Sequence, residues 1–143
     1  MRNSILLFFL FGALANVNAQ IFESDWEHAI ERAKEESKPL VLVFSGSDWC
    51  IPCIKLEREV WENEFFKAHA VKNYVLYRAD FPKRKKNQLP QNLKVQHQAL
   101  AEEYNPQGYF PYVVVLDANL NVNGVFGYEK KEVKHYIKQI DGR

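Results

Sequence analysis

The sequence predicts a single α/β domain with a central mixed β-sheet and helices on both of its faces. From residue 20 to residue 143, short apolar segments alternate with segments of helical periodicity. This alternation is typical of a sheet that is covered by helices on both sides. No internal repeat or low-complexity linker divides the region, and its length suits one domain with its own core.

Strands are predicted where apolar residues follow one another or alternate over short stretches. Residues 40–44 form a fully apolar run of the kind found in buried central strands. Residues 74–80 and 112–117 are predicted to be the next two strands, and residues 121–128 are predicted to return as a hairpin. These segments provide the strands of the mixed sheet.

Helices are predicted from capping residues and from apolar spacing. Ser24 and Glu27 fit a capping box, with Ser24 as the N-cap, ahead of apolar residues at helical spacing up to residue 33. Asn63 is predicted to cap a short helix that ends near residue 70. Further helices are predicted after Cys50, over residues 93–104 and over residues 130–140.

Residues 1–19 have the pattern of a cleavable signal peptide. Arg2 precedes the apolar stretch 5–14, and small residues lead to a cleavage site after Ala19. The stretch is shorter than the roughly 20 residues of a membrane-spanning helix, so no stable membrane anchor is expected. The protein is therefore predicted to be periplasmic or secreted. The alternative is an N-terminal helix that stays attached as an anchor.

The charge balance bears on the class of partner. The chain has 19 basic and 18 acidic residues, and without Arg2 the two counts are equal. A neutral domain argues against nucleic acid or an anionic membrane as the main partner. The four histidines are scattered and are expected on surfaces or helix faces, and the basic run 83–86 is either a solvated loop or a steering site for an acidic partner.

Both cysteines of the chain lie three residues apart, in the segment Trp49-Cys50-Ile51-Pro52-Cys53. The segment follows an apolar strand and begins a helical pattern. A thiolate at a helix N-terminus is stabilised there, and the second sulfur lies close enough to form a ring. Thiol-disulfide exchange is the chemistry that this arrangement suits. A static structural disulfide and half of a zinc site are the alternatives, but no metal is expected, because no second Cys/His pair has ligand spacing.

Together with the preceding strand and with Phe110-Pro111 ahead of residues 112–117, this segment resembles the thioredoxin superfamily. The charged insert at 80–86, followed by residues 100–104 and 108–111, resembles a narrower group of exported bacterial thioredoxin-like proteins. The resemblance covers nearly all of residues 20–143 and implies a thioredoxin-like fold. It also implies a cis peptide bond at Pro111, which faces the cysteine pair in that family.

The positions of the motif residues predict their roles. Cys50 is expected to be the exposed nucleophile, and Cys53 the resolving thiol that releases the product. Ile51 and Pro52 are motif residues, and Pro52 stiffens the loop because the helix start does not use its missing N–H. The resemblance further implies that Trp49, Phe110 and Pro111 bind substrate, with the backbone of Phe110 pairing with an extended polypeptide.

Two departures from thioredoxin are visible. Counting back from Cys50, Phe44 stands where thioredoxin has a buried aspartate that takes a proton from the resolving thiol. The attack of Cys53 on the mixed disulfide is then expected to be slower, or to transfer its proton to Glu57, Glu59 or a water. Phe44→Asp is expected to raise the turnover of mixed disulfides. Tyr112 stands where threonine is usual. The aromatic residues around it either form a substrate groove or belong to the core.

These observations predict a thiol-disulfide oxidoreductase that reduces or isomerises disulfides in exported proteins. No cofactor is expected, and a membrane-embedded thiol relay is the expected electron donor. A binding module with a structural disulfide and an oxidant that introduces disulfides are the alternatives. The uncharged Ile51-Pro52 dipeptide favours a reductant. The substrate, the donor and the oligomeric state are left open.

Overall fold

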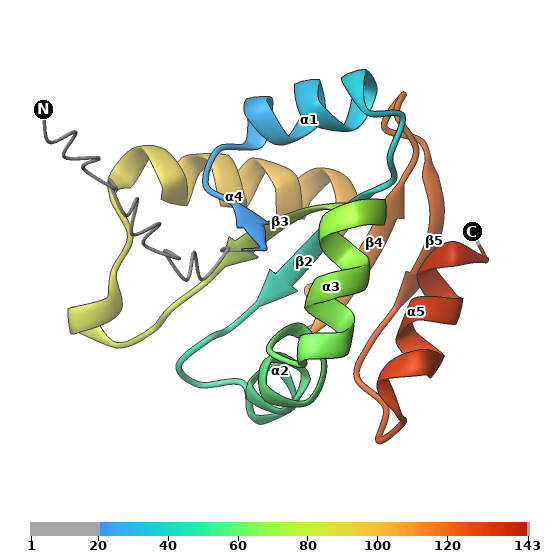
Figure 1. Ribbon diagram of the computed structural model, residues 1–143. Helices are drawn as coiled ribbons and strands as arrows, with labels where there is room; N and C mark the ends of the chain where they lie inside the picture. The colour runs from blue at the N-terminus through green and yellow to red at the C-terminus, as the bar shows by residue number, and fades with distance from the viewer. Residues whose placement is uncertain (1–20, 143) are drawn as a thin grey trace, which may run out of the picture.

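The structure is a computed structural model that describes residues 21–142 (Figure 1). The predicted signal peptide, residues 1–19, lies outside the described residues. The described chain contains five strands and five α-helices, in the order β1 (Phe22–Glu23), α1 (Trp26–Glu35), β2 (Leu40–Ser45), α2 (Ile51–Leu56), α3 (Glu64–Asn73), β3 (Val75–Asp80), α4 (Gln91–Tyr104), β4 (Tyr112–Leu116), β5 (Val122–Phe126) and α5 (Val133–Asp141). A π-helical turn (Glu57–Trp61) continues α2, and a 3-10 turn (Lys85–Asn87) precedes α4.

The strands form one mixed sheet, as the sequence predicted, and their order is β1-β3-β2-β4-β5. Strands β1 and β2 run parallel to β3, whereas β4 is antiparallel to β2 and β5 is antiparallel to β4. In the centre, Val43 of β2 lies between Arg78 of β3 and Val113 of β4. The apolar run of β2 is buried throughout, which agrees with its central position.

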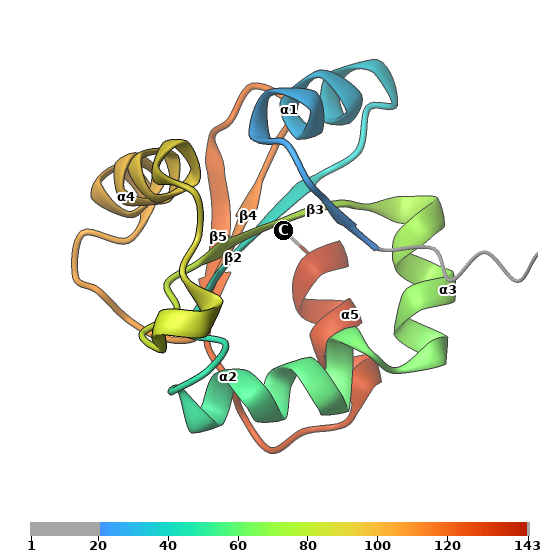
Figure 2. The same ribbon diagram turned by 90° about the vertical axis from the view of Figure 1, so that its left-hand side faces the viewer.

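Helices cover both faces of the sheet, and each face has its own core (Figure 2). Side chains of a strand alternate between the two faces. Accordingly, Val41 and Val43 pack against residues of α2, α3 and α5, whereas Leu40, Leu42 and Phe44 pack against residues of α1 and α4. Each fully buried aliphatic or aromatic side chain contributes about 1.5–3 kcal/mol to folding, so the fold has no need of the disulfide as its main support.

The structure corrects the predicted start of α1. The N-cap is Asp25, whose carboxylate accepts the backbone N–H of His28 at 2.8 Å, so Ser24 and Glu27 do not form a capping box. Aspartate and serine are comparable N-caps, and the two stand side by side here. The prediction for Asn63 is confirmed, since its side chain accepts N–H groups of the first turn of α3.

Two further features differ from the sequence prediction. The edge strand β1 was not predicted, because its two residues are too few to show an alternating pattern. Helix α5 begins at Val133 rather than at residue 130. Within residues 21–142, no helix is both long and apolar enough to cross a membrane.

Candidate redox site

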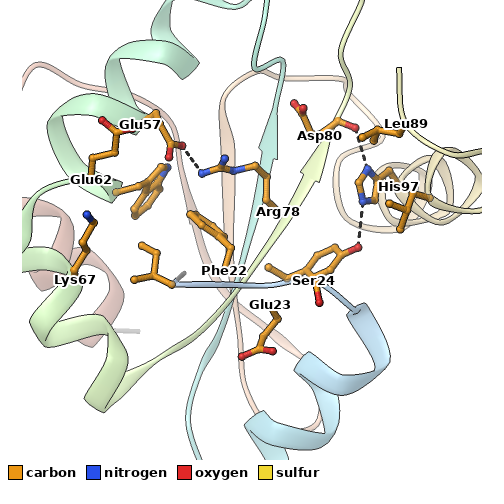
Figure 3. Close-up of a pocket in the computed structure, with 14 residues that line it drawn as sticks. Phe22, Glu23, Ser24, Glu57, Glu62, Lys67, Arg78, Asp80, Leu89 and His97 are labelled. Carbon is orange, nitrogen blue, oxygen red and sulfur yellow. Dashed lines mark hydrogen bonds and ion pairs between the residues drawn. The ribbon is translucent and has the colours of Figure 1, made fainter. Parts of the chain in front are cut away.

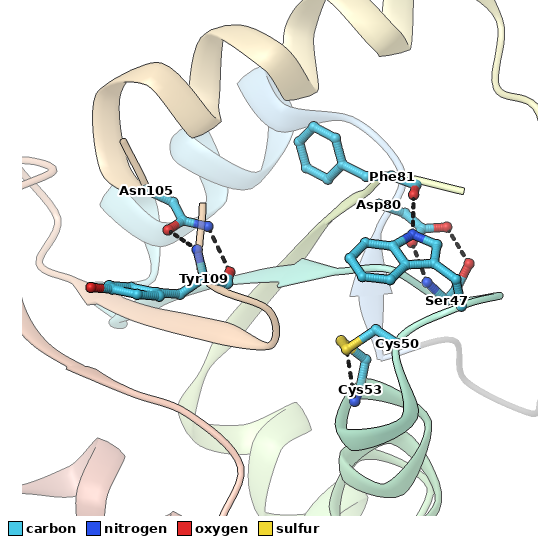
Figure 4. The surroundings of a disulfide bond; sticks show 8 residues. Ser47, Cys50, Cys53, Asp80, Phe81, Asn105 and Tyr109 are labelled. Atoms are coloured by element: carbon cyan, nitrogen blue, oxygen red, sulfur yellow. Dashed lines mark hydrogen bonds between the residues drawn. A yellow bond between two sulfur atoms is a disulfide. The ribbon is translucent and has the colours of Figure 1, made fainter. Parts of the chain in front are cut away.

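The two cysteines lie where β2 leads into α2, and their sulfurs form a disulfide (Figure 4). Cys50 is the N-cap residue of α2, and its Sγ accepts the backbone N–H of Cys53 at 3.3 Å. The first N–H groups of a helix have no partner within the helix. A thiolate on Cys50 would therefore be stabilised by a directed N–H group and by the positive end of the helical backbone.

The exposure of the pair differs from the prediction for Cys50. Cys50 is 5% exposed and Cys53 is 4% exposed, so the expected exposed nucleophile is nearly buried in the disulfide state. In a disulfide each sulfur shields the other, which accounts for part of this burial. The side chain that follows Cys50 is open to solvent, because Ile51 is 62% exposed. Ile51 and Pro52 form the first turn of α2, as predicted.

The loop ahead of Cys50 is fixed to the end of β3. The backbone N–H and the hydroxyl of Ser47 donate to the two carboxylate oxygens of Asp80, at 2.9 Å and 2.5 Å. The carbonyl oxygen of Asp80 in turn accepts from Nδ1 of His97, whose Nε2 lies 3.1 Å from the hydroxyl of Tyr77. Burial lowers the pKa of His97, which lies on the buried face of α4, in agreement with the helix-face position expected for it.

Asp48 fixes the same loop to the charged insert. Its carboxylate accepts the backbone N–H groups of Lys83 and Arg84 and the side-chain amide of Asn87, each at 2.9 Å. The hydrogen bond from the backbone of Lys83 is the largest cause of the lowered pKa of Asp48. The insert, which follows β3, is thus a structural part of the site.

Trp49 is partly buried and contacts residues from other segments of the chain. A Cβ atom on Gly46 would lie 2.3 Å from its ring, so only glycine permits this approach. Its indole N–H donates to the carbonyl oxygen of Phe81 at 2.8 Å, and the ring meets that of Phe110 edge to face at 5.4 Å. The ammonium group of Lys83 lies 3.9 Å from the ring centre. This brings together Trp49 and Phe110, two of the residues that the resemblance assigned to substrate binding.

The peptide bond between Phe110 and Pro111 is cis, as expected. The loop ahead of it is held by the buried side chain of Asn105, which donates to the carbonyl oxygen of Tyr109 at 2.8 Å and accepts its N–H at 3.0 Å (Figure 4). Gly108 has a φ of 69°, a conformation that favours glycine. Pro111 itself is buried directly before β4.

A polar hollow of about 250 Å³ lies beside Cys53. Ser45 and Glu57 line it, and so does Arg78, whose guanidinium forms an ion pair with the Glu57 carboxylate. Glu57 stands four residues after Cys53 in the helical segment, so the two side chains lie on the same helix face. This places a carboxylate near the resolving thiol.

The hollow distinguishes the acids that the sequence left open. Phe44 belongs to the core that faces α1 and α4, whereas Ser45, the next residue, lines the hollow with Cys53. This geometry gives the expectation for Phe44→Asp no support, because the new carboxylate would lie on the face of the sheet that packs against α1 and α4. Glu59 accepts a hydrogen bond from the hydroxyl of Tyr128 at 2.8 Å and does not line the hollow.

A larger cavity of about 550 Å³ lies at the edge of the sheet where β1 pairs with β3 (Figure 3). The lining includes Phe22, Glu57, Arg78 and His97, but neither cysteine. The ion pair between Glu57 and Arg78 borders both this cavity and the hollow beside Cys53. The larger cavity is thus next to the redox site without being part of it.

The thioredoxin-like family profile matches residues 21–118 of the chain. The chain is also 32% identical to the disulfide bond reductase DsbH of Chlamydia pneumoniae over 118 residues, which is 80% of this chain and 69% of that protein. The chain belongs to the thioredoxin-like family. A solved structure of a DsbH oxidoreductase superposes with a TM-score of 0.79 at 28% identity, covering 97% of this chain and 93% of that one. A thioredoxin of Thermus thermophilus shares the fold, with a TM-score of 0.61 at 14% identity over 82% of each chain.

The protein is thus a thioredoxin-like oxidoreductase homologous to a disulfide bond reductase, with a CxxC redox pair at Cys50 and Cys53. Sequence reasoning found this pair, its motif and the cis proline. It missed the residues that support them, of which Asp48, Asp80, His97 and Asn105 are the main ones. The Asn105-Pro106 pair at the end of α4 was a visible turn signal. The partners of the other three come from distant segments and leave no local pattern.

Proposed function

We propose that this protein reduces disulfide bonds in exported polypeptides through the Cys50–Cys53 couple. The observation that carries the proposal is the hydrogen bond from the N–H of Cys53 to the sulfur of Cys50 at the start of α2. This contact favours the thiolate that thiol-disulfide exchange requires. The homology to a disulfide bond reductase supports the reducing direction.

The reaction starts from the dithiol form of the pair. The thiolate of Cys50 attacks one sulfur of the substrate disulfide, and the other substrate sulfur leaves as a thiolate, which takes up a proton. Cys53, once deprotonated, attacks the sulfur of Cys50 and releases the second substrate thiolate. The substrate gains two electrons and two protons, and the protein is left with the disulfide seen here.

We propose that the carboxylate of Glu57 accepts the proton that the thiol of Cys53 loses in the second step. Its carboxylate lines the hollow that Cys53 also lines, and it stands one helical turn beyond that cysteine. Arg78 cannot take up a proton and instead holds the Glu57 carboxylate by an ion pair. Ser45, at the end of β2, provides a hydroxyl in the same hollow. A general base in this position would speed the second step of the exchange.

The location and the electron source follow from the same proposal. The signal pattern of residues 1–19 supports export to the periplasm or the medium. Outside the cytosol, the disulfide form must be returned to the dithiol by another dithiol, and we propose a membrane-embedded thiol relay as this donor. The exposed side chains of Ile51 and Tyr109, with Trp49 and Phe110, would contact the polypeptide substrate.

The decisive experiment compares Cys53→Ala with Cys50→Ala. A fluorescent peptide with one disulfide is offered to each reduced variant, and covalent adducts are separated by non-reducing electrophoresis. Cys53→Ala should accumulate an adduct through Cys50, and Cys50→Ala should form little. Adducts in neither variant would show that the disulfide is static and that the chain is a binding module.

The reduction potential of the couple then determines the direction of transfer. The protein is equilibrated with dithiothreitol or glutathione buffers, and the free thiols are counted. A value near that of thioredoxin, about −270 mV, supports a reductase. A value above about −180 mV would assign the protein to isomerases or oxidants and overturn the proposed direction.

A further inference from the structure

Four consecutive basic residues follow Pro82 in the insert between β3 and α4, and all four are exposed. We propose that this segment, here called the basic rim (Lys83, Arg84, Lys85 and Lys86), binds acidic segments that flank the disulfide of a polypeptide substrate. The inference rests on the proposed function, because it assigns a substrate class to the same site. It selects between the two interpretations that the sequence left open for this run.

The backbone of the basic rim is fixed, which a solvated loop would not require. Asp48 accepts the N–H groups of Lys83 and Arg84 at 2.9 Å. The side-chain amide of Gln88 donates to the carbonyl oxygen of Pro82 at 2.9 Å. The chain between these contacts forms a 3-10 turn. The backbone therefore presents the four cationic side chains from a defined position.

That position is beside the disulfide. Asp48, which holds the rim, is two residues before Cys50, and Lys83 places its ammonium group 3.9 Å from the centre of the Trp49 ring. Figure 2 shows the segment next to the loop that leads into α2. A polypeptide whose disulfide reaches Cys50 would pass close to Lys83 and the rest of the rim, and such charges act over about 10 Å at moderate salt.

The charges of the rim are free to act on a partner. Among residues 21–142, no carboxylate lies within 4.0 Å of a side-chain nitrogen of the rim. Asp48 lies at the backbone of the rim and interacts with the charge of Arg84, so it offsets part of the positive charge, whereas Asp80 accepts from Ser47. The rim is thus a positive surface on a chain that is almost neutral overall.

An acidic polypeptide fits this surface better than a nucleic acid or a membrane. The exposed apolar side chain of Ile51 directly follows Cys50 and suits the side chains of a polypeptide. Binding of a nucleic acid or an anionic membrane draws on an extended basic surface, whereas this chain has only a short basic segment and equal charges beyond Arg2. The rim would select among disulfides by the charge of the residues next to them.

The test uses three peptides with the same disulfide and acidic, neutral or basic flanking residues. Their reduction is followed at low and high salt with wild-type protein and with K85E/K86E. Lys83 and Arg84 are left intact because their backbones hold the loop. We expect K85E/K86E to lower kcat/KM for the acidic peptide about tenfold at low salt. For the neutral peptide, kcat/KM should stay within about twofold of wild type. At high salt, the variant and the wild type should reduce the acidic peptide equally well.

K34E/K72E is the matched control, because it changes the net charge equally. These two exposed lysines lie near the ends of α1 and α3, at the opposite end of the sheet from Cys50. The control should keep the preference for the acidic peptide. If both double variants lower it equally, net charge alone is responsible and the rim is not a binding site. Thermal unfolding checks that both variants are folded.

A second measurement separates this inference from the proposed function. Acidic and basic peptides with serine in place of cysteine are titrated against the wild-type protein, so binding is measured without redox chemistry. If the wild-type protein binds the acidic peptide more tightly than the basic one, and K85E/K86E abolishes this difference, the rim is a binding site for acidic segments. This conclusion holds even if no disulfide is reduced. Equal binding of the two peptides overturns it. Retention by anionic lipid vesicles that is lost in K85E/K86E, without any preference among peptides, would also overturn it in favour of a membrane site.

Discussion

Cys50 and Cys53 are joined in one disulfide, yet their surroundings differ. Cys50 is flanked in the chain by Trp49 and Ile51, at a surface of apolar and aromatic side chains. Cys53 faces a polar hollow with Glu57 and its ion-pair partner on β3. The two cysteines are three residues apart in the sequence. Cys50 caps the start of α2, whereas Cys53 lies within the helix, so their side chains have different neighbours.

Under the proposed function, the difference corresponds to the two steps of thiol-disulfide exchange, with Cys50 as the first sulfur and Cys53 as the second. The first sulfur must meet a polypeptide and exist as a thiolate, which calls for apolar contacts and a free N–H group. The second sulfur meets only Cys50 and must lose a proton at the right moment, which calls for a nearby base. The predictions below change one environment at a time.

The largest effect is expected from Glu57→Gln, which removes the base beside Cys53 and keeps the shape of the side chain. Release of a chromogenic thiol from the mixed disulfide on Cys50 should slow about 10²-fold, the lower end of the range for general bases. The rate is measured by stopped-flow absorbance. Attack by Cys50 on the same reagent should change much less.

Glu59→Gln is the matched control, because Glu59 is in the same helical turn but bonds to Tyr128 and does not line the hollow. It should leave the release rate within about threefold of wild type. If Glu57→Gln resolves the mixed disulfide at the rate of Glu59→Gln, a water or another group takes the proton and the assignment of Glu57 fails.

The next largest effect is expected on the side of Cys50, from Asn105→Ala. The buried amide of Asn105 makes two hydrogen bonds to the backbone of Tyr109, and its loss leaves both groups without their partner. The free energy of unfolding should fall by about 2 kcal/mol. Urea unfolding measures this change. KM for a disulfide peptide should rise while the release rate from Cys50 stays as in wild type.

Asn92, exposed on α4, provides the comparison for that variant. Asn92→Ala should change the free energy of unfolding by less than about 0.5 kcal/mol. An Asn105→Ala protein with an unchanged KM would show that the loop before Pro111 does not contact substrate.

The residues that perform the chemistry were predictable because their signals are local. Cys50, Pro52 and Cys53 form one short motif, and the apolar run before them identifies the strand that leads into it. The fold followed from alternating periodicities and from the resemblance of both halves of the chain to one superfamily. Pro111 could be assigned a cis bond only through that resemblance.

The support of the site was not predictable, because it joins segments distant in the sequence. Asp48 holds the backbone of the insert, and Asp80 holds Ser47. Counting along the chain singled out Phe44 as the position of the missing aspartate, whereas Ser45, on the opposite face of β2, lines the hollow beside Cys53. Successive side chains of a strand point to opposite faces of the sheet, so the count alone does not identify the neighbours of Cys53.

A smaller effect is expected from Asp48→Ala, which frees the insert on the Cys50 side. The free energy of unfolding should fall, because the insert loses three hydrogen bonds to the Asp48 carboxylate. Limited digestion with a protease that cuts after lysine and arginine should show faster cleavage within residues 83–86. Asp117→Ala is the control, since Asp117 accepts N–H groups of its own turn between β4 and β5. It should lower stability without faster cleavage at 83–86.

The smallest effect is a pH dependence that comes from His97. Burial holds the pKa of His97 below its usual value in the folded protein, so as the pH falls below about 6.5 the unfolded chain takes up a proton that the folded chain does not. Stability contributed by this group is therefore complete above pH 7 and declines on acidification. Between pH 7 and pH 6 the loss should stay below about 1 kcal/mol.

His97→Gln removes this titrating group, so urea unfolding at the two pH values should show a smaller acid loss for the variant than for wild type. Because His97 contacts the carbonyl oxygen of Asp80, and Asp80 holds Ser47, the variant should also weaken the loop before Cys50 at every pH. The exchange rate of Cys50 should then fall while release by Cys53 does not. If His97→Gln slows attack by Cys50 and release by Cys53 equally, His97 supports the surroundings of both sulfurs. The two sulfurs would then not have independent surroundings.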